Sequence, residues 1–170
     1  MKIGFIGYNA FGGEGGDRVF DEVRRLDPLT DYVVVMPHWG VEYSRERTLT
    51  QQKLAHAWID VGADLVVGSH PHVVEPIEVY KGRAIFYSLG NFVFDQGFSK
   101  QTQEGLGVGV SFKTDGVAFS LLPTEQHDIQ VSLSASSARA TMFAWIADHS
   151  DAPASVIAAM RSGQFTLGKP

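Results

Sequence analysis

The sequence predicts a mixed α/β fold in which parallel β-α-β units are followed by antiparallel hairpins and two C-terminal helices. Strand-like and helix-like stretches alternate through the first half of the chain, at the spacing that is typical of β-α-β units. Beyond Gly90 this alternation stops, and short strand patterns separated by turn residues replace it. A length of 170 residues with 44% hydrophobic composition suits one globular domain.

Three strands and two helices are expected in the β-α-β part. The strands are expected at residues 2–8, 32–36 and 65–67. The second of them is a continuous β-branched run, which is typical of a strand in a sheet covered on both faces. A glycine-rich turn at residues 12–16 precedes the first helix, with Asp17 as the expected N-cap. Thr48 is expected to cap the second helix, which ends near residue 61.

The rest of the chain predicts antiparallel strands and then helices. Two hairpins are expected, one pairing residues 75–80 with 83–88 and the other pairing 107–113 with 117–122. A further strand is expected at 129–133, followed by helices at 140–148 and 153–162. We therefore expect residues 1–133 to form the main domain and residues 134–170 to form a C-terminal helical extension of the same domain.

Composition and charge exclude several classes of function. With 14 basic and 19 acidic residues, the net charge of -5 does not favour nucleic acid as a partner. The absence of cysteine excludes disulfides and thiolate catalysis, so a metal must take histidine, carboxylate or amide donors. No apolar run reaches the roughly 18 residues of a membrane span, and the first residues do not form a signal peptide. The chain as written is therefore expected in the cytoplasm.

Three histidines are the strongest candidates for chemistry. His38 follows the second predicted strand, and His70 and His72 follow the third. Open α/β sheets place ligand sites at the carboxyl ends of their parallel strands, so the three imidazoles are expected to converge. Pro71 keeps His70 out of the helical region, so an extended turn is expected there. Imidazole is a good ligand for manganese, zinc and iron, and we predict one or two divalent ions of this group.

Four segments resemble the poly-γ-glutamate capsule-biosynthesis (CapA-type) family. They are His38-Trp39-Gly40-Val41-Glu42-Tyr43, Gly62-Ala63-Asp64, Gly68-Ser69-His70-Pro71-His72-Val73 and Tyr87-Ser88-Leu89-Gly90-Asn91-Phe92. The resemblance runs from about Met1 through Asp95. That family looks like a branch of the calcineurin-like metallophosphoesterases, which have a four-layer α-β-β-α sandwich around two metals.

The resemblance also implies a ligand assignment. His38 and His70 would bind one metal, and His72 would bind the other. The superfamily's remaining ligands, two aspartates and an Asn-His pair, belong to strands before the matched region. The sequence therefore resembles the C-terminal half of such a protein, and the expected fold is a half or distorted version of the sandwich.

Further residues near the histidines are candidates for supporting roles. His70 and Asn91 are the expected catalytic residues, although asparagine at position 91 is equally typical of a turn. Glu42 is expected either to orient His38 or to be solvated. Ser69 is expected either to orient a metal ligand or to contact substrate. Arg45 is the nearest candidate for binding an anionic substrate, with a solvated loop arginine as the alternative.

Two functions fit these residues. The first is metal-dependent hydrolysis of a phosphoester or related bond in capsule biosynthesis, with an anionic substrate. The alternative is a non-catalytic half-domain that binds a complementary N-terminal half-chain, a second copy or an acidic polymer. A half-sandwich of this kind is expected to expose apolar sheet surface. If the chain is a fragment of a full-length capsule-type protein, the cell envelope or the extracellular space is the expected location.

Overall fold

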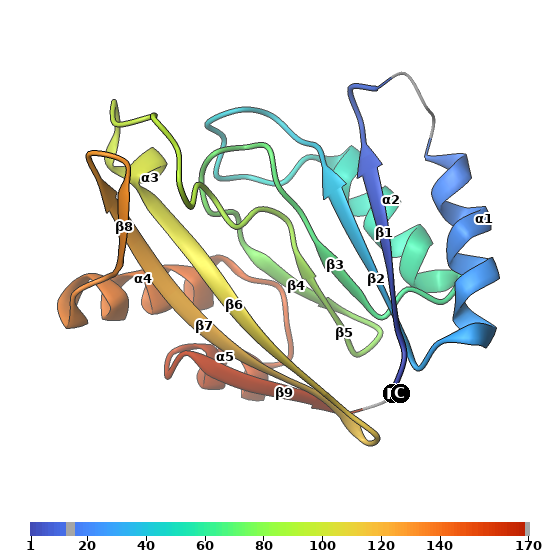
Figure 1. Cartoon of the computed structure of the whole chain (residues 1–170). Helices are drawn as coiled ribbons and strands as arrows, with labels where there is room; N and C mark the ends of the chain where they lie inside the picture. The colour runs from blue at the N-terminus through green and yellow to red at the C-terminus, as the bar shows by residue number, and fades with distance from the viewer. Residues whose placement is uncertain (13–15, 169–170) are drawn as a thin grey trace.

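A five-stranded sheet forms the centre of the computed structural model, which describes residues 1–12 and 16–168 (Figure 1). Its strand order is β1-β2-β3-β5-β4. The pairs β1–β2, β2–β3 and β3–β5 are parallel, and the edge strand β4 is antiparallel to β5. The strands are β1 (Ile3–Asn9), β2 (Tyr32–His38), β3 (Leu65–Val67), β4 (Ile77–Tyr80) and β5 (Arg83–Phe86). The predicted β-α-β units and the first hairpin are thereby confirmed.

A second, four-stranded sheet is wholly antiparallel and is built around one long strand. Its strands are β6 (Glu104–Lys113), β7 (Gly116–His127), β8 (Gln130–Leu133) and β9 (Gln164–Gly168). β7 pairs with β6 over most of its length, and with β9 and then β8 along its other edge. Pro123 lies between the residues that pair with β9 and those that pair with β8, so its missing N–H removes no bond to either strand. Sequence reasoning predicted the hairpin and β8 but missed β9.

Helices α1 (Asp17–Leu26) and α2 (Leu49–Asp60) cover one face of the five-stranded sheet (Figure 1). α2 begins with the predicted Thr48 cap: Thr48 Oγ1 accepts from the Gln51 amide, and Gln51 Oε1 accepts from the Thr48 amide. α1 starts one residue earlier than expected, because Gly16 is its N-cap and Asp17 its first residue. The centre of the glycine-rich turn, residues 13–15, lies outside the described residues.

The other face of the large sheet packs against the second sheet. This central core also takes side chains from the two predicted C-terminal helices, α4 (Ser136–His149) and α5 (Ala154–Met160). The short elements η1 (Asp27–Leu29) and α3 (Lys100–Gln103) were not predicted. Two facing sheets with helices confirm the expected partial sandwich. The division of the chain at residue 133 stays a prediction.

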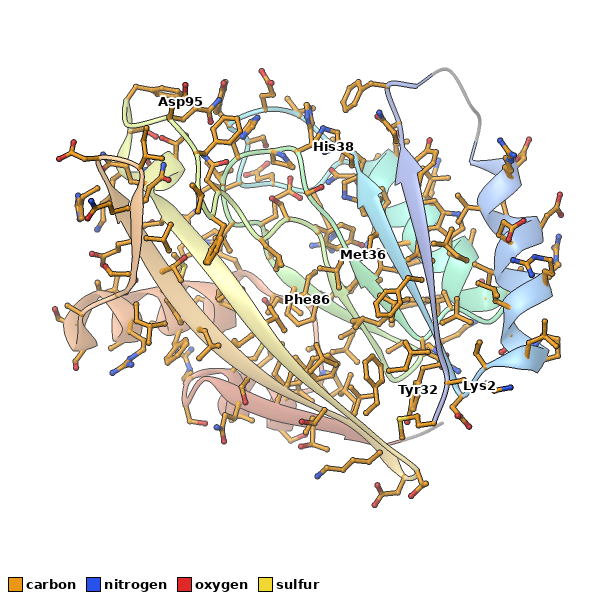
Figure 2. All side chains as sticks on the ribbon, viewed as in Figure 1. Lys2, Tyr32, Met36, His38, Phe86 and Asp95 are labelled. Atoms are coloured by element: carbon orange, nitrogen blue, oxygen red, sulfur yellow. The ribbon has the colours of Figure 1, made fainter. Side chains whose placement is uncertain are left out.

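One part of the inner sheet face is left uncovered. Tyr32, Val34 and Met36 lie on the same side of β2, but Met36 is 49% exposed while Tyr32 and Val34 are buried. Figure 2 labels Tyr32 and Met36 on this strand. Phe5, opposite Val34 on β1, is 64% exposed. β1 is also the edge of the sheet, with no further strand beyond it in the described chain. Exposed apolar sheet surface was the feature expected of a half-sandwich.

No helix within residues 1–12 and 16–168 combines the length and the apolar character needed to cross a membrane.

Candidate metal centre

The candidate residues lie at or just after the ends of three adjacent parallel strands, at one edge of the large sheet. His38 is the last residue of β2, His70 and His72 follow β3, and Asn91 follows β5. Because β2, β3 and β5 are neighbours, their carboxyl ends meet at this edge, as the sequence predicted.

Backbone hydrogen bonds join the two histidine loops. The Ser69 amide donates to the Pro37 carbonyl at 2.9 Å, and the Trp39 amide donates to the Ser69 carbonyl at 3.0 Å. Farther along, the Tyr43 amide donates to the Pro71 carbonyl at 2.8 Å. These bonds continue the pairing of β2 with β3 past the strand ends. They also hold the loop that contains Glu42 against the loop that contains His70 and His72.

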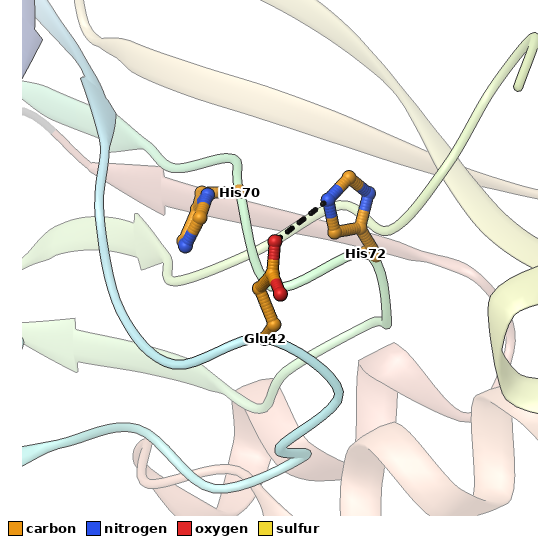
Figure 3. A group of neighbouring side chains, drawn as sticks. All are labelled: Glu42, His70 and His72. Atoms are coloured by element: carbon orange, nitrogen blue, oxygen red, sulfur yellow. Dashed lines mark ion pairs between the residues drawn. The ribbon is translucent and has the colours of Figure 1, made fainter. Parts of the chain in front are cut away.

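Glu42, His70 and His72 form a compact group of potential metal ligands (Figure 3). One ligand atom from each lies within 4.8 Å of the others, and His72 Nε2 lies 3.8 Å from Glu42 Oε1. His38 adjoins this group, since its Nε2 lies 3.1 Å from His70 Nδ1. The structure thus brings the three predicted histidines together. It also places Glu42 beside His72 with its side chain half exposed, where the sequence had left open whether Glu42 orients His38 or is solvated.

One distance at the site suits a shared divalent cation. Two imidazole nitrogens bound at about 2.1 Å to one ion lie roughly 3.0–3.4 Å apart, which matches the separation of His38 Nε2 and His70 Nδ1. Burial, followed by the neighbouring His38, lowers the pKa of His70, which favours the neutral imidazole that a metal requires. The residues present therefore form a possible metal-binding group.

The two outer histidines are oriented through their Nδ1 atoms. His72 Nδ1 donates to Asn91 Oδ1 at 2.9 Å, so His72 Nε2 faces Glu42. His38 Nδ1 donates to Ser69 Oγ at 3.3 Å, and Ser69 in turn donates to the Pro37 carbonyl. Such contacts fix the tautomer and direction of metal-binding histidines. Ser69 and Asn91 thus occupy positions that suit orienting residues.

The backbone at the site adopts an uncommon conformation. Tyr43, His70 and His72 have φ values of 64°, 104° and 63°, in a region that side-chain-bearing residues rarely enter. Pro71 does keep His70 out of the right-handed helical region, but the result is a positive φ rather than the extended turn expected from sequence. Strained residues of this kind cluster at functional sites because the surrounding structure must hold them there.

Aromatic side chains surround the histidines. Phe11 contacts His70 with ring centroids 4.3 Å apart, while Tyr43 and Phe94 flank His72 at 5.8 and 5.0 Å. Tyr43 belongs to one of the four motif segments, whereas Phe11 and Phe94 carry no sequence signal beyond their apolar character. Trp39 is buried core, with its indole N–H bonded to the Tyr87 carbonyl.

Arg45 takes no part in this cluster. Its guanidinium lies 3.5 Å from the centre of the Trp145 ring, and its Nε donates to the Val74 carbonyl. A role for Arg45 toward substrate stays a prediction, and its contacts place it against the C-terminal helix α4.

A buried carboxyl group in the segment after His72 predicts a pH effect on stability. Glu75 is 1% exposed, and burial raises its pKa to about 7. The folded chain therefore holds this proton more tightly than the unfolded chain. The free energy of unfolding should fall by about 2 kcal/mol between pH 5.5 and 8, and it should level off above the folded pKa.

Urea unfolding at the two pH values tests this expectation. Glu75→Gln should remove most of the decrease, because the amide cannot ionise and still accepts the hydrogen bond from Gln51 Nε2. Glu46→Gln, at an exposed position, should leave it unchanged. An identical pH dependence in wild type and Glu75→Gln would contradict the assignment.

Asn91 provides a second testable contact. Asn91→Ala should weaken metal binding by about 10- to 100-fold, because His72 loses the acceptor that holds its ring. Gln96→Ala is a matched control, since Gln96 bonds the other side of the Asn91 amide and does not contact His72. Isothermal titration with Mn²⁺ or Zn²⁺ measures both variants. Equal affinities for Asn91→Ala and Gln96→Ala would show that the contact to His72 has no special role.

The fold and the cluster define an α/β protein with a possible metal site at the carboxyl edge of its parallel strands. A family model described as "Bacterial capsule synthesis protein PGA_cap" matches residues 10–96, which include all four potential ligands. That match covers half of the chain. The chain therefore belongs to the bacterial capsule synthesis protein family, as its motifs predicted.

Individual relatives agree with this assignment. The PGA biosynthesis protein CapA of Bacillus subtilis is 50% identical over 99 residues, which cover 58% of this chain and 26% of that protein. The capsule biosynthesis protein CapA of Bacillus anthracis is 49% identical over 88 residues, covering 52% and 21%. A probable polyglutamine synthesis accessory protein of Mycobacterium tuberculosis is 34% identical over 85 residues, covering 50% and 20%. The matched part of this chain thus spans about a quarter or less of each relative.

Proposed function

We propose that this chain carries a metal-binding site that hydrolyses a phosphoester or related bond in the synthesis of a poly-γ-glutamate capsule. The observation that carries the proposal is the convergence of His38, His70, His72 and Glu42 at one sheet edge. The names of the Bacillus relatives support the capsule context. A divalent ion of manganese, zinc or iron would supply Lewis acidity for the hydrolysis.

Each residue has a proposed task in this site. His38, His70, His72 and Glu42 would hold the metal, and the Glu42 carboxylate would offset part of its charge. Asn91 and Ser69 would keep His72 and His38 in the required tautomers through the bonds to their Nδ1 atoms. Phe11, Tyr43 and Phe94, which are all partly exposed to solvent, would form an apolar rim beside His70 and His72.

Metal content and turnover test the proposal together. The purified chain is incubated with Mn²⁺, Zn²⁺ or Fe²⁺, freed of excess metal and analysed by plasma mass spectrometry, and hydrolysis of bis(p-nitrophenyl) phosphate is followed in parallel. Bound metal with turnover above that of free metal is the expected result. Absence of both would overturn the proposal.

A second candidate function rests on a different observation. Phe5 and Met36 are exposed on a sheet face that elsewhere forms core, and Glu42 is the one carboxylate in the ligand group among the described residues. Both features favour the complementary half-chain of the alternative function, a non-catalytic half-domain that binds such a half-chain or an acidic polymer, because a half-chain would cover the apolar face and add anionic ligands. Metal binding without turnover, together with concentration-dependent association in sedimentation velocity, would favour this function.

The location of the protein stays a prediction. For a longer capsule-type protein that contains this chain, we propose the cell envelope or the extracellular space.

A further inference from the structure

A pocket of about 380 Å³ lies apart from the metal centre, where the loop before α2 meets the end of α4. None of the four potential metal ligands lines it. Its polar and charged lining consists of Arg45, Glu46, Arg47, Thr48, Gln52 and His149. The charge balance among these side chains decides what the pocket can bind.

Arg45 is the unusual member of this lining. Its guanidinium stacks on Trp145 at 3.5 Å, and no carboxylate of the described chain lies within ion-pair distance of it. Glu104, whose charge does act on Arg45, pairs instead with Lys100 at 3.5 Å. Burial lowers the pKa of Arg45, which shows that its cation has lost part of its hydration. A guanidinium that is held in place, partly desolvated and unpaired is prepared to bind an anion.

Arg47 and His149 are held in place beside it. Arg47 Nε lies 3.4 Å from Glu78 Oε2, and Arg47 Nη2 lies 3.7 Å from Asp151 Oδ2, so Arg47 already has two carboxylate partners. His149 stacks on Trp145 and donates Nδ1–H to the Trp145 carbonyl at 2.8 Å. Nε2 of the neutral ring is then an acceptor, so the contact to an anion falls to Arg45. Trp145 thus supports both Arg45 and His149. Glu46, the carboxylate of the lining, is an exposed residue at its rim.

We propose that this pocket binds an oxyanion, either a carboxylate or a phosphate group of an acidic ligand, through Arg45 stacked on Trp145. The site lies in chain segments that meet only in the folded protein, with Arg45 before α2 and Trp145 on α4. It does not depend on the metal centre, so metal-free protein should bind the anion. An acidic polymer could then be held by this pocket at a distance from the metal.

Nuclear magnetic resonance titration tests the site. Metal is removed with EDTA, the EDTA is dialysed away, and ¹⁵N-labelled protein is titrated with sodium phosphate and, separately, with glutarate, at constant ionic strength set by chloride. Saturable shifts are expected at the amides of residues 45–49 and at the Trp145 indole. Tighter binding of phosphate identifies a phosphoryl ligand, and tighter binding of glutarate identifies a carboxylate ligand. Shifts confined to residues 69–72, or no saturation, would overturn the proposal.

Two variants make the test specific. Arg45→Gln should raise the Kd of the anion by at least about tenfold, since a hydrogen-bonded charge contributes on this scale. Arg24→Gln is the matched control, because Arg24 is an exposed arginine on α1 that pairs with Asp21. An unchanged Kd in Arg45→Gln would contradict the proposal. If this variant fails to fold by circular dichroism, the shift map of the wild-type protein decides alone.

Discussion

Replacing His72 with alanine is expected to weaken binding of a divalent metal by more than about 100-fold. Removing a group that only orients a ligand already costs about 10- to 100-fold, and His72 supplies a ligand atom itself. Its Nε2 faces Glu42, and its Nδ1 is occupied by Asn91. Loss of the ring leaves His38, His70 and Glu42 as potential ligands and removes the imidazole that Asn91 holds in place.

The measurement combines calorimetric titration with Mn²⁺ or Zn²⁺ and thermal unfolding. His72 contributes little to the apolar core, so the variant should keep a circular dichroism spectrum close to that of the wild type. His127→Ala is the matched control, because His127 is exposed and its side chain approaches Glu125, away from the ligand group. Retention of wild-type metal affinity in His72→Ala would show that the cluster is not a metal site.

Replacing Gly68 with alanine is expected to lower the free energy of unfolding by at least about 3 kcal/mol. A Cβ at this position would lie 2.0 Å from the Tyr87 carbonyl oxygen and 2.5 Å from Trp39 Nε1. Those two atoms are hydrogen-bonded to each other at 2.9 Å, so neither can move without breaking a buried contact. In a chain of this size, such a loss lowers the melting temperature by roughly 6–12 °C.

A second glycine supplies the control for this experiment. Gly7 lies on the edge strand β1, and a Cβ there would have no heavy atom within 4 Å. Gly7→Ala should therefore leave stability within about 0.5 kcal/mol of the wild type. Because Gly68 directly precedes Ser69 and the two candidate histidines, Gly68→Ala should also weaken metal binding, whereas Gly7→Ala should not. Equal stability of the two variants would contradict the predicted clash.

Local patterns predicted most of the fold. The strands up to β8 and the four longer helices follow from hydrophobic periodicity, from the Thr48 cap and from turn residues such as Asp115-Gly116. β9 could not be found in this way. It is five residues long, and it forms because Phe165 and Leu167 pair with Phe119 and Val117 of β7, far earlier in the chain. Pairing between distant segments leaves no local pattern to recognise.

The candidate site, like the fold, could be predicted from the sequence only in part. Convergence of the histidines was predictable, because strand ends at one edge follow from parallel topology. The position of Glu42 was not predictable, since it depends on a positive φ at Tyr43 and on the bond from Tyr43 to Pro71. Neither Arg45 on Trp145 nor Phe11 against His70 could be predicted, because both contacts join segments that are distant in the sequence and meet through tertiary packing.

The exposed pair Phe5 and Met36 has a consequence for the protein inside a cell. Chaperones and proteases recognise apolar strand segments that folded proteins normally hide, and here such a segment is present on the native chain. Turnover of the protein should then depend on whether these two side chains are covered. Any surface that covers both side chains would remove this apolar segment from such recognition without altering the fold of the chain.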